Sequence, residues 1–204
     1  MIMMTTLFQT IAGILVAFFL YYGMDVRRQD GARDFAAPVW QTLMKLCSFL
    51  LVGAFLWIAL STHQVSLGDW LDLAVMISGT TFVTAAKNEL GRAHTFTGQY
   101  LANPRLVTTG VYAITRNPLY FGVLQCEVGA SLLVVHHGTV LFPRSYPYGL
   151  SILAVALLYA VFFNWYMAVH EARYLLRYFG EEYRRYRTDV PFAVPLIGLR
   201  KDVK

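Results

Sequence analysis

Charged residues are scarce in this chain of 204 residues. Asp, Glu, Lys and Arg make up 14% of it, whereas 57% of the residues are hydrophobic and the mean hydropathy is +0.49. This composition excludes an ordinary soluble domain and a disordered chain. The two cysteines, Cys47 and Cys126, both lie in apolar runs, which excludes a disulfide framework and a cysteine metal cluster. With no repeats or linkers, residues 1–204 are predicted to form one integral membrane domain.

Five apolar stretches are long enough to be considered as membrane spans. A helix needs about 20 residues to cross about 30 Å of hydrocarbon. The third stretch is the weakest, because Asp69 and Asp72 stand at its start and hydroxyl residues line it; within a bundle, these hydroxyls can bond back to helix carbonyls. The fold class is therefore an all-α, polytopic membrane protein with about five transmembrane helices, the N-terminal ones within residues 1–90. The stretches are residues 6–23, 39–61, 70–86, 118–136 and 147–168.

The basic residues predict how these helices are oriented. Fifteen of the 17 Lys and Arg residues follow the first, third or fifth stretch, Arg144 follows the fourth, and Lys45 lies near the start of the second. By the positive-inside rule, the N-terminus is outside, the C-terminus is cytoplasmic and the number of crossings is odd. Residues 1–6 lack Lys and Arg, so the first stretch is expected to be retained rather than cleaved as a signal peptide. No nucleic-acid partner is expected, because the basic residues flank membrane segments.

Residues 106–122, LVTTGVYAITRNPLYFG, form the most informative block. Pro118 suits the first turn of a helix and Asn117 can cap it, so Arg116-Asn117-Pro118 taken alone favours a simple helix start. Gly110 and Gly122 can let a ligand approach the backbone, and the aromatic rings of the block can lie near a cation. A helix start also offers free N–H groups to a carboxylate.

A second block, residues 170–195, supplies a carboxylate. Glu171 lies just after the last apolar stretch and can hold a cationic group of a ligand. The alternative is a surface ion pair with Arg173 or Arg177, which would contribute little stability. The rest of the block alternates Tyr, Arg and Leu around Phe179-Gly180, which predicts an interrupted amphipathic tail at the membrane surface.

In this order, the two blocks resemble the isoprenylcysteine carboxyl methyltransferase family, which groups with phospholipid methyltransferases. The resemblance implies a membrane enzyme that uses S-adenosyl-L-methionine, with residues 91–204 as its core and the tail closing over the cofactor. It also implies that Arg116 and Glu171 are catalytic. The implied cofactor contacts are Leu106, Val107, Tyr112, Asn117, Pro118, Leu119, Tyr120 and Glu171.

The sequence departs from this family at three positions. Asn117 replaces a histidine, which keeps hydrogen bonding but removes protonation. Pro104 replaces another histidine and removes a side-chain contact. Met167 stands where carboxyl-methylating relatives carry an arginine, which argues against a prenylcysteine carboxylate as the acceptor and leaves methyl transfer to another lipophilic or membrane-associated acceptor.

Glu127 lies inside the fourth stretch, where an ionisable residue usually faces a cavity or a partner. It is a candidate proton acceptor, with Asn164 and His170 on the next stretch as its partners or as further acceptor contacts; a purely structural hydrogen bond is the alternative. Gln125 is expected on another face. The pair His136-His137 is expected in an exposed outer loop without a metal, because the nearby sequence offers no further ligands.

Two other functions remain open. A membrane sterol or enone reductase that uses NADPH shares a motif of the type Arg-His-Pro-x-Tyr-x-Gly, although the lead-in and the short tail of this chain argue against it. A non-catalytic membrane protein could also retain the scaffold, and Met167 is its support in the sequence.

Overall fold

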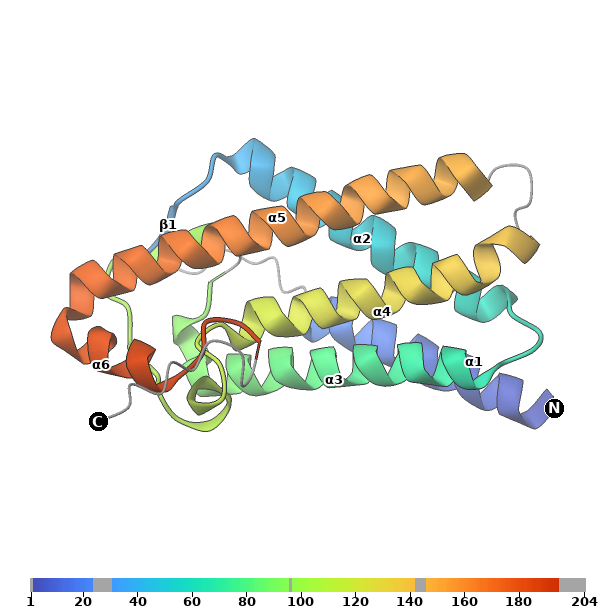
Figure 1. The fold of residues 1–204 in the computed structure, drawn as a ribbon, viewed down its shortest axis with the longest axis horizontal. Helices are drawn as coiled ribbons and strands as arrows, with labels where there is room; N and C mark the ends of the chain where they lie inside the picture. The colour runs from blue at the N-terminus through green and yellow to red at the C-terminus, as the bar shows by residue number, and fades with distance from the viewer. Residues whose placement is uncertain (1, 24–30, 96, 142–145, 195–204) are drawn as a thin grey trace.

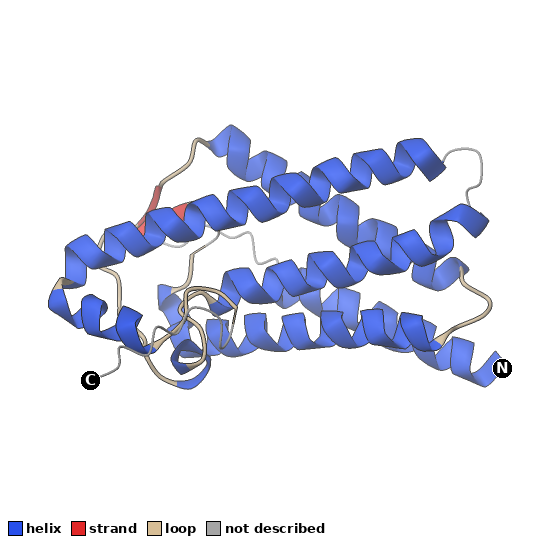
Figure 2. Cartoon of the chain, in the orientation of Figure 1, coloured by secondary structure: helices blue, strands red, loops and turns tan. Residues whose placement is uncertain are grey.

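The computed structural model describes residues 2–23, 31–95, 97–141 and 146–194. Most of this part of the chain is helical (Figure 2), as the composition predicted. A short π-helix, η1 (Phe19–Gly23), extends the first helix, and two short 3₁₀ helices, η2 (Gly91–Ala93) and η3 (Gly110–Ala113), lie between residues 90 and 118. The α-helices are α1 (Ile2–Phe18), α2 (Pro38–Ser61), α3 (Leu67–Leu90), α4 (Pro118–Leu141), α5 (Tyr146–Phe179) and α6 (Glu181–Asp189).

Four helical segments in the described part of the chain are long and apolar enough to cross a membrane. They are Ile2–Gly23, Pro38–Ser61, Pro118–Gly138 and Pro147–Phe179. α3 does not reach that hydropathy, in line with its prediction as the weakest stretch, and it packs closely along α4 inside the bundle. The chain is therefore a multi-pass helical membrane protein.

Glycines bring α3 and α4 into close contact. A Cβ atom on Gly79 would lie 2.5 Å from the carbonyl oxygen of Gly122, and one on Gly122 would lie 2.6 Å from that of Gly79. A Cβ on Gly129 would likewise approach the carbonyl of Asp72 to 2.8 Å. The expectation that Gly122 admits a ligand is therefore wrong, because this glycine admits the backbone of α3.

The hydroxyl groups of α3 bond as expected for a helix in a bundle. Thr80 Oγ1 donates to the carbonyl of Met76 at 2.9 Å, and Thr81 Oγ1 donates to that of Ile77 at 2.8 Å. Gln125 of α4 donates to Ser78 Oγ at 3.3 Å. These bonds satisfy polar groups that would be costly to leave unpaired in an apolar bundle.

The long helices run lengthwise, with α1 beginning at the end of the bundle opposite α6 (Figure 1). The loop after α3 and the α6 tail share the other end. There, β1 (Ala32–Asp34) pairs antiparallel with β2 (Gln99–Leu101), a ladder of three residues per strand that the sequence did not predict. Gly180, with φ of +55°, separates α5 from α6, which places the predicted interruption of the tail between two helices.

Candidate active site

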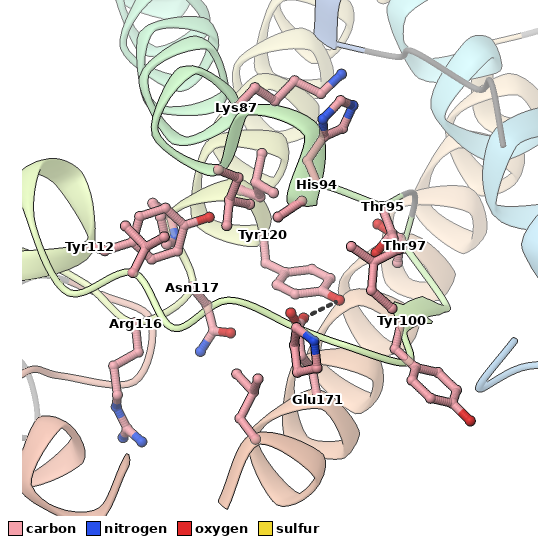
Figure 3. Close-up of a pocket in the computed structure, with 18 of the residues that line it drawn as sticks. Lys87, His94, Thr95, Thr97, Tyr100, Tyr112, Arg116, Asn117, Tyr120 and Glu171 are labelled. Carbon is pink, nitrogen blue, oxygen red and sulfur yellow. Dashed lines mark hydrogen bonds between the residues drawn. The ribbon is translucent and has the colours of Figure 1, made fainter. Parts of the chain in front are cut away.

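A cavity opens where α4 begins and α5 ends, beneath the loop that joins β2 to α4 (Figure 3). α2, α3 and α6 also contribute residues to its wall. All eight predicted cofactor residues line this cavity, and so does Arg116. The two sequence blocks, about fifty residues apart, therefore meet in one site.

Tyr120 and Glu171 meet in the centre of the view in Figure 3. The hydroxyl of Tyr120, on the first turn of α4, donates a hydrogen bond of 3.0 Å to Oε2 of Glu171 on α5. Glu171 thus faces the cavity, whereas the Arg177 Nε donates to the carbonyl of Arg173 at 3.4 Å. The surface ion pair considered for Glu171 is not formed in the structure.

Tyrosines from two elements form aromatic walls. Tyr112 of η3 and both Tyr183 and Tyr186 of α6 are buried and line the cavity. Tyr186 donates its hydroxyl proton to the carbonyl oxygen of Tyr112 at 2.6 Å. Burial raises the pKa of Tyr186, and burial followed by the nearby charge of Glu171 raises the pKa of Tyr112. Both phenols are therefore neutral donors near pH 7.

Gly110 shapes the loop before α4. Its φ is +56°, and a Cβ atom there would collide with the carboxylate of Glu89. Oε1 of Glu89 accepts a hydrogen bond of 3.1 Å from the backbone N–H of Val111. The expectation that Gly110 lets a ligand approach is wrong. The missing side chain of Gly110 instead leaves room for the carboxylate of Glu89 beside the turn.

Hydrogen bonds fasten the segment after α6 to the start of α4. The backbone N–H of Arg116 donates to Pro191 at 2.9 Å, and Nδ2 of Asn117 donates to the carbonyl of Phe192 at 2.6 Å. Thr115 Oγ1 donates to the carbonyl of Ala193 at 2.6 Å. The side-chain nitrogen of Asn117 thus holds the tail. The backbone carbonyl of Asn117 accepts the first hydrogen bond of α4, from the N–H of Phe121. The segment after α6 therefore lies against the start of α4.

Arg116 lies on the tail side of the cavity. Its guanidinium carbon lies 5.4 Å from the ring centre of Phe192, and in Figure 3 it points away from Glu171. Burial raises the pKa of Tyr183, and the Arg116 charge partly offsets that rise. Within the described residues, the buried Nε of Arg116 has no hydrogen-bond partner, which leaves a donor for a ligand.

Glu127, Asn164 and His170 each have a different partner among the described residues. Glu127 Oε1 accepts a hydrogen bond of 2.8 Å from Ser48 of α2, so the expectation of Asn164 or His170 as its partner is wrong. Asn164 Oδ1 accepts a bond of 3.4 Å from Thr97, and the His170 ring packs against Tyr166 with 4.3 Å between ring centres.

These three residues lie outside the cavity wall, but two of their contacts belong to it. Ser48 and Thr97 both line the cavity, and they link it to Glu127 and Asn164 respectively. Helix periodicity could not reveal these links, because the hydroxyl residues come from distant segments. Gln125 faces Ser78 rather than Ser48, which confirms that it lies on another face of α4.

Several residues of the wall were not predicted from the sequence. Lys87, in the last turn of α3, donates to the carbonyl oxygen of Tyr22 at 2.6 Å. Tyr174 donates to the carbonyl of Leu101 at 2.8 Å and so fixes β2 against α5. Lys87 could have been found as the basic residue directly after the third apolar stretch, whereas the position of Tyr174 depends on the ladder of β1 and β2. The remaining unpredicted polar and aromatic residues of the wall are His94, Thr95, Tyr100, Arg105, Tyr183 and Tyr186.

Comparisons with known proteins give one family and three relatives. The model of the phospholipid methyltransferase family matches residues 67–182. The chain is 28% identical over 168 residues to a protein-S-isoprenylcysteine O-methyltransferase of Schizosaccharomyces pombe. The aligned region covers 82% of this chain and 61% of that protein.

Two further relatives carry similar names. Protein-S-isoprenylcysteine O-methyltransferase B of Arabidopsis thaliana is 28% identical over 66% of this chain and 57% of its own length. The Homo sapiens protein-S-isoprenylcysteine O-methyltransferase is 29% identical over 69% of this chain and 42% of its own length. The chain thus spans less than two thirds of each relative that it matches.

Proposed function

Because the chain belongs to the phospholipid methyltransferase family, we propose that it transfers a methyl group from S-adenosyl-L-methionine to a lipophilic acceptor in the membrane. The observation that carries this proposal is the position of Glu171. Its carboxylate faces a cavity with aromatic walls, beside the start of α4, and is hydrogen-bonded to Tyr120.

The residues of the cavity fit the chemical groups of this cofactor. The carboxylate of Glu171 suits its ammonium group, and the first N–H groups of α4, which have no partner within the helix, suit its carboxylate. The buried Nε of Arg116 is a further donor. The rings of Tyr112 and Tyr183 offer faces for a cation or an adenine.

When bound, S-adenosyl-L-methionine supplies an electrophilic methyl group next to a positively charged sulfur. The chain's own contribution is to position the reactants and exclude water. The segment after α6 is bonded to Arg116 and Asn117, so the tail covers this end of the cavity. Buried Tyr112 and Tyr186 complete the dry wall.

A proton acceptor is available at the inner part of the cavity. Ser48 lines the wall and donates to Glu127 Oε1 at 2.8 Å, while Glu127 Oε2 has no hydrogen-bond partner within the described residues. We assign to Glu127 the role of receiving, through Ser48, the proton that the acceptor gives up. This role keeps the predicted function of Glu127 as a proton acceptor and adds Ser48 as its link to the cavity. Asn164 and His170 have no part in it.

The wall near Ser48 is apolar, which suits a lipophilic acceptor. Met44 and Val123 line it, and Met167 packs behind Met44 in a buried cluster. Met167 offers no cation to grip a carboxylate in the way an arginine does. The proposed acceptor is therefore a neutral or protonatable nucleophile on an apolar body, such as an amine, thiol or hydroxyl. We expect weak methylation of a farnesylcysteine analogue, and efficient methylation would contradict this choice of acceptor.

Calorimetric titration of the purified protein in detergent tests the cofactor. S-adenosyl-L-methionine should bind, and NADPH should not. The reverse result would favour a membrane reductase, and the absence of binding by either would favour a non-catalytic scaffold.

A further inference from the structure

A cluster of four titratable residues lies at the end of the bundle opposite the cavity (Figure 1). Asp69 and Asp72 belong to the first turns of α3, and His136 and His137 to the last turns of α4. From the sequence, the histidines were expected in an exposed outer loop without further ligands. This expectation is wrong, because α4 continues to Leu141 and its packing against α3 brings in two aspartates from more than sixty residues away.

The side chains of the cluster lie within coordination range of one another. Nδ1 of His136 lies 2.9 Å from Oδ2 of Asp72, and Nε2 of His137 lies 2.7 Å from Oδ1 of Asp69. One potential ligand atom each from Asp69, Asp72 and His136 falls within 4.8 Å of the other two. A single small cation can therefore contact all three residues.

Asp72 provides an independent indication of a ligand. This residue is 4% exposed, and within the described chain its Oδ2 has no well-aligned hydrogen bond. Its neighbour is Nδ1 of His136 at 2.9 Å, which forms an ion pair with it only when the imidazole is protonated. With a neutral imidazole, the lone pairs of these two atoms can both point at one cation. A buried carboxylate oxygen without a donor is costly, and a metal ion removes that cost.

Asp69 is held in place for such a role. Its Oδ2 accepts hydrogen bonds from Ser66, at 2.7 Å from the backbone N–H and 2.9 Å from Oγ. Its Oδ1 accepts from His137, and a carboxylate has about four lone-pair sites, so capacity remains for a cation. A histidine that orients a ligating carboxylate in this way is typical of the outer partners of metal sites.

We propose that Asp69, Asp72 and His136 bind a divalent transition-metal ion such as Zn²⁺, with His137 orienting Asp69. The mixed nitrogen and oxygen donors favour Zn²⁺ over Ca²⁺ or Mg²⁺, which prefer oxygen ligands alone. Two buried carboxylates carry a charge that a divalent cation neutralises. The side chain of His136 is 44% exposed, which gives the ion an entry path. The bound ion would clamp the start of α3 to the end of α4.

Metal binding to the purified protein in detergent tests this site without reference to activity. At neutral pH, the wild type should bind one Zn²⁺ per chain in competition with a chromophoric chelator, and its unfolding temperature should rise. His136→Ala and Asp72→Asn should each lower the affinity more than tenfold and abolish the rise. His137→Ala should lower the affinity by about tenfold. His63→Ala is the matched control, since His63 is exposed at the same end of the bundle, and it should bind as the wild type does.

Absorption by bound Co²⁺ provides a second measurement in case a variant folds poorly. The wild type should give the visible bands of a tetrahedral site, and His136→Ala should change them while its circular dichroism spectrum is retained. The absence of Zn²⁺ binding by the wild type would overturn the proposal in favour of histidine–aspartate ion pairs alone. Equal binding by wild type, His136→Ala and Asp72→Asn would also overturn it.

Discussion

The hydroxyl of Tyr120 donates a hydrogen bond of 3.0 Å to Glu171, and this bond joins the first turn of α4 to α5 across the cavity. The two residues lie 51 positions apart, so packing of the helices creates the pair. A carboxylate in this position has an aromatic hydroxyl on one side and the cavity on the other.

Replacing Glu171 by Ala should weaken binding of S-adenosyl-L-methionine by about tenfold or more. The variant removes a charge-assisted contact of about 1.5 to 3 kcal/mol, and each decade of affinity corresponds to about 1.36 kcal/mol. Calorimetry in detergent measures the change. Glu181→Ala is the control, because Glu181 is exposed and pairs with Arg184 at the surface. Equal affinity of the Glu171 variant and the wild type would show that the cofactor does not contact this carboxylate.

Replacing Gly122 by Ala should destabilise the bundle. The new methyl group would lie 2.6 Å from the carbonyl oxygen of Gly79, so α3 and α4 must separate, at a cost of about 1 to 3 kcal/mol. Thermal unfolding in detergent measures this loss. Gly13→Ala is the matched control, since a Cβ on Gly13 meets nothing within 4 Å and alanine favours a helix by up to about 1 kcal/mol. A variant at position 122 that unfolds at the temperature of the wild type would contradict the observed packing.

The basic residues lead us to expect that the cavity faces the cytoplasm. Gln64→Cys, in the loop before α3, should react with an impermeant thiol reagent added outside, whereas Asn103→Cys, near the cavity, should be protected. Both positions are exposed, and the native Cys126 is buried. Lysis of the cells, as a control, should expose Asn103→Cys. Equal labelling of both positions in intact cells would refute this orientation.

Replacing Glu127 by Gln should lower turnover and leave cofactor affinity nearly unchanged. The amide keeps the size of the side chain but cannot accept a proton as a carboxylate does. Ser48→Ala should cause a similar loss, because Ser48 links Glu127 to the cavity. Gln125→Ala is the control, since this residue faces Ser78. Full turnover in Glu127→Gln would leave Glu127 with a structural role only.

The helices and part of the cavity wall could be predicted from the sequence, for different reasons. Long apolar runs produce helices through burial and backbone hydrogen bonding. The predicted stretches 39–61 and 147–168 therefore begin one residue after the observed starts of α2 and α5. The candidate cofactor residues were implied by the resemblance of two motifs to a methyltransferase family, and the structure places all of them in one cavity.

Contacts between distant segments could not be predicted in the same way. The partner of Glu127 is Ser48 on α2, and the partners of His136 and His137 lie on α3. These pairs depend on which faces of two helices meet, and a hydrophobic pattern does not specify partners. Gly110 and Gly122 show the same limit, because the sequence indicates close approach but does not say what approaches.

Transfer of label from S-adenosyl-L-methionine carrying a labelled methyl group tests the central claim most directly. The purified protein is incubated with this cofactor and a membrane lipid extract, and the products are read by mass spectrometry. The wild type should place the label on a lipophilic product, and Glu171→Ala should lower the yield by about tenfold or more at limiting cofactor. A wild-type protein that yields no labelled product from this extract, or a Glu171→Ala variant that matches its yield, would contradict the account.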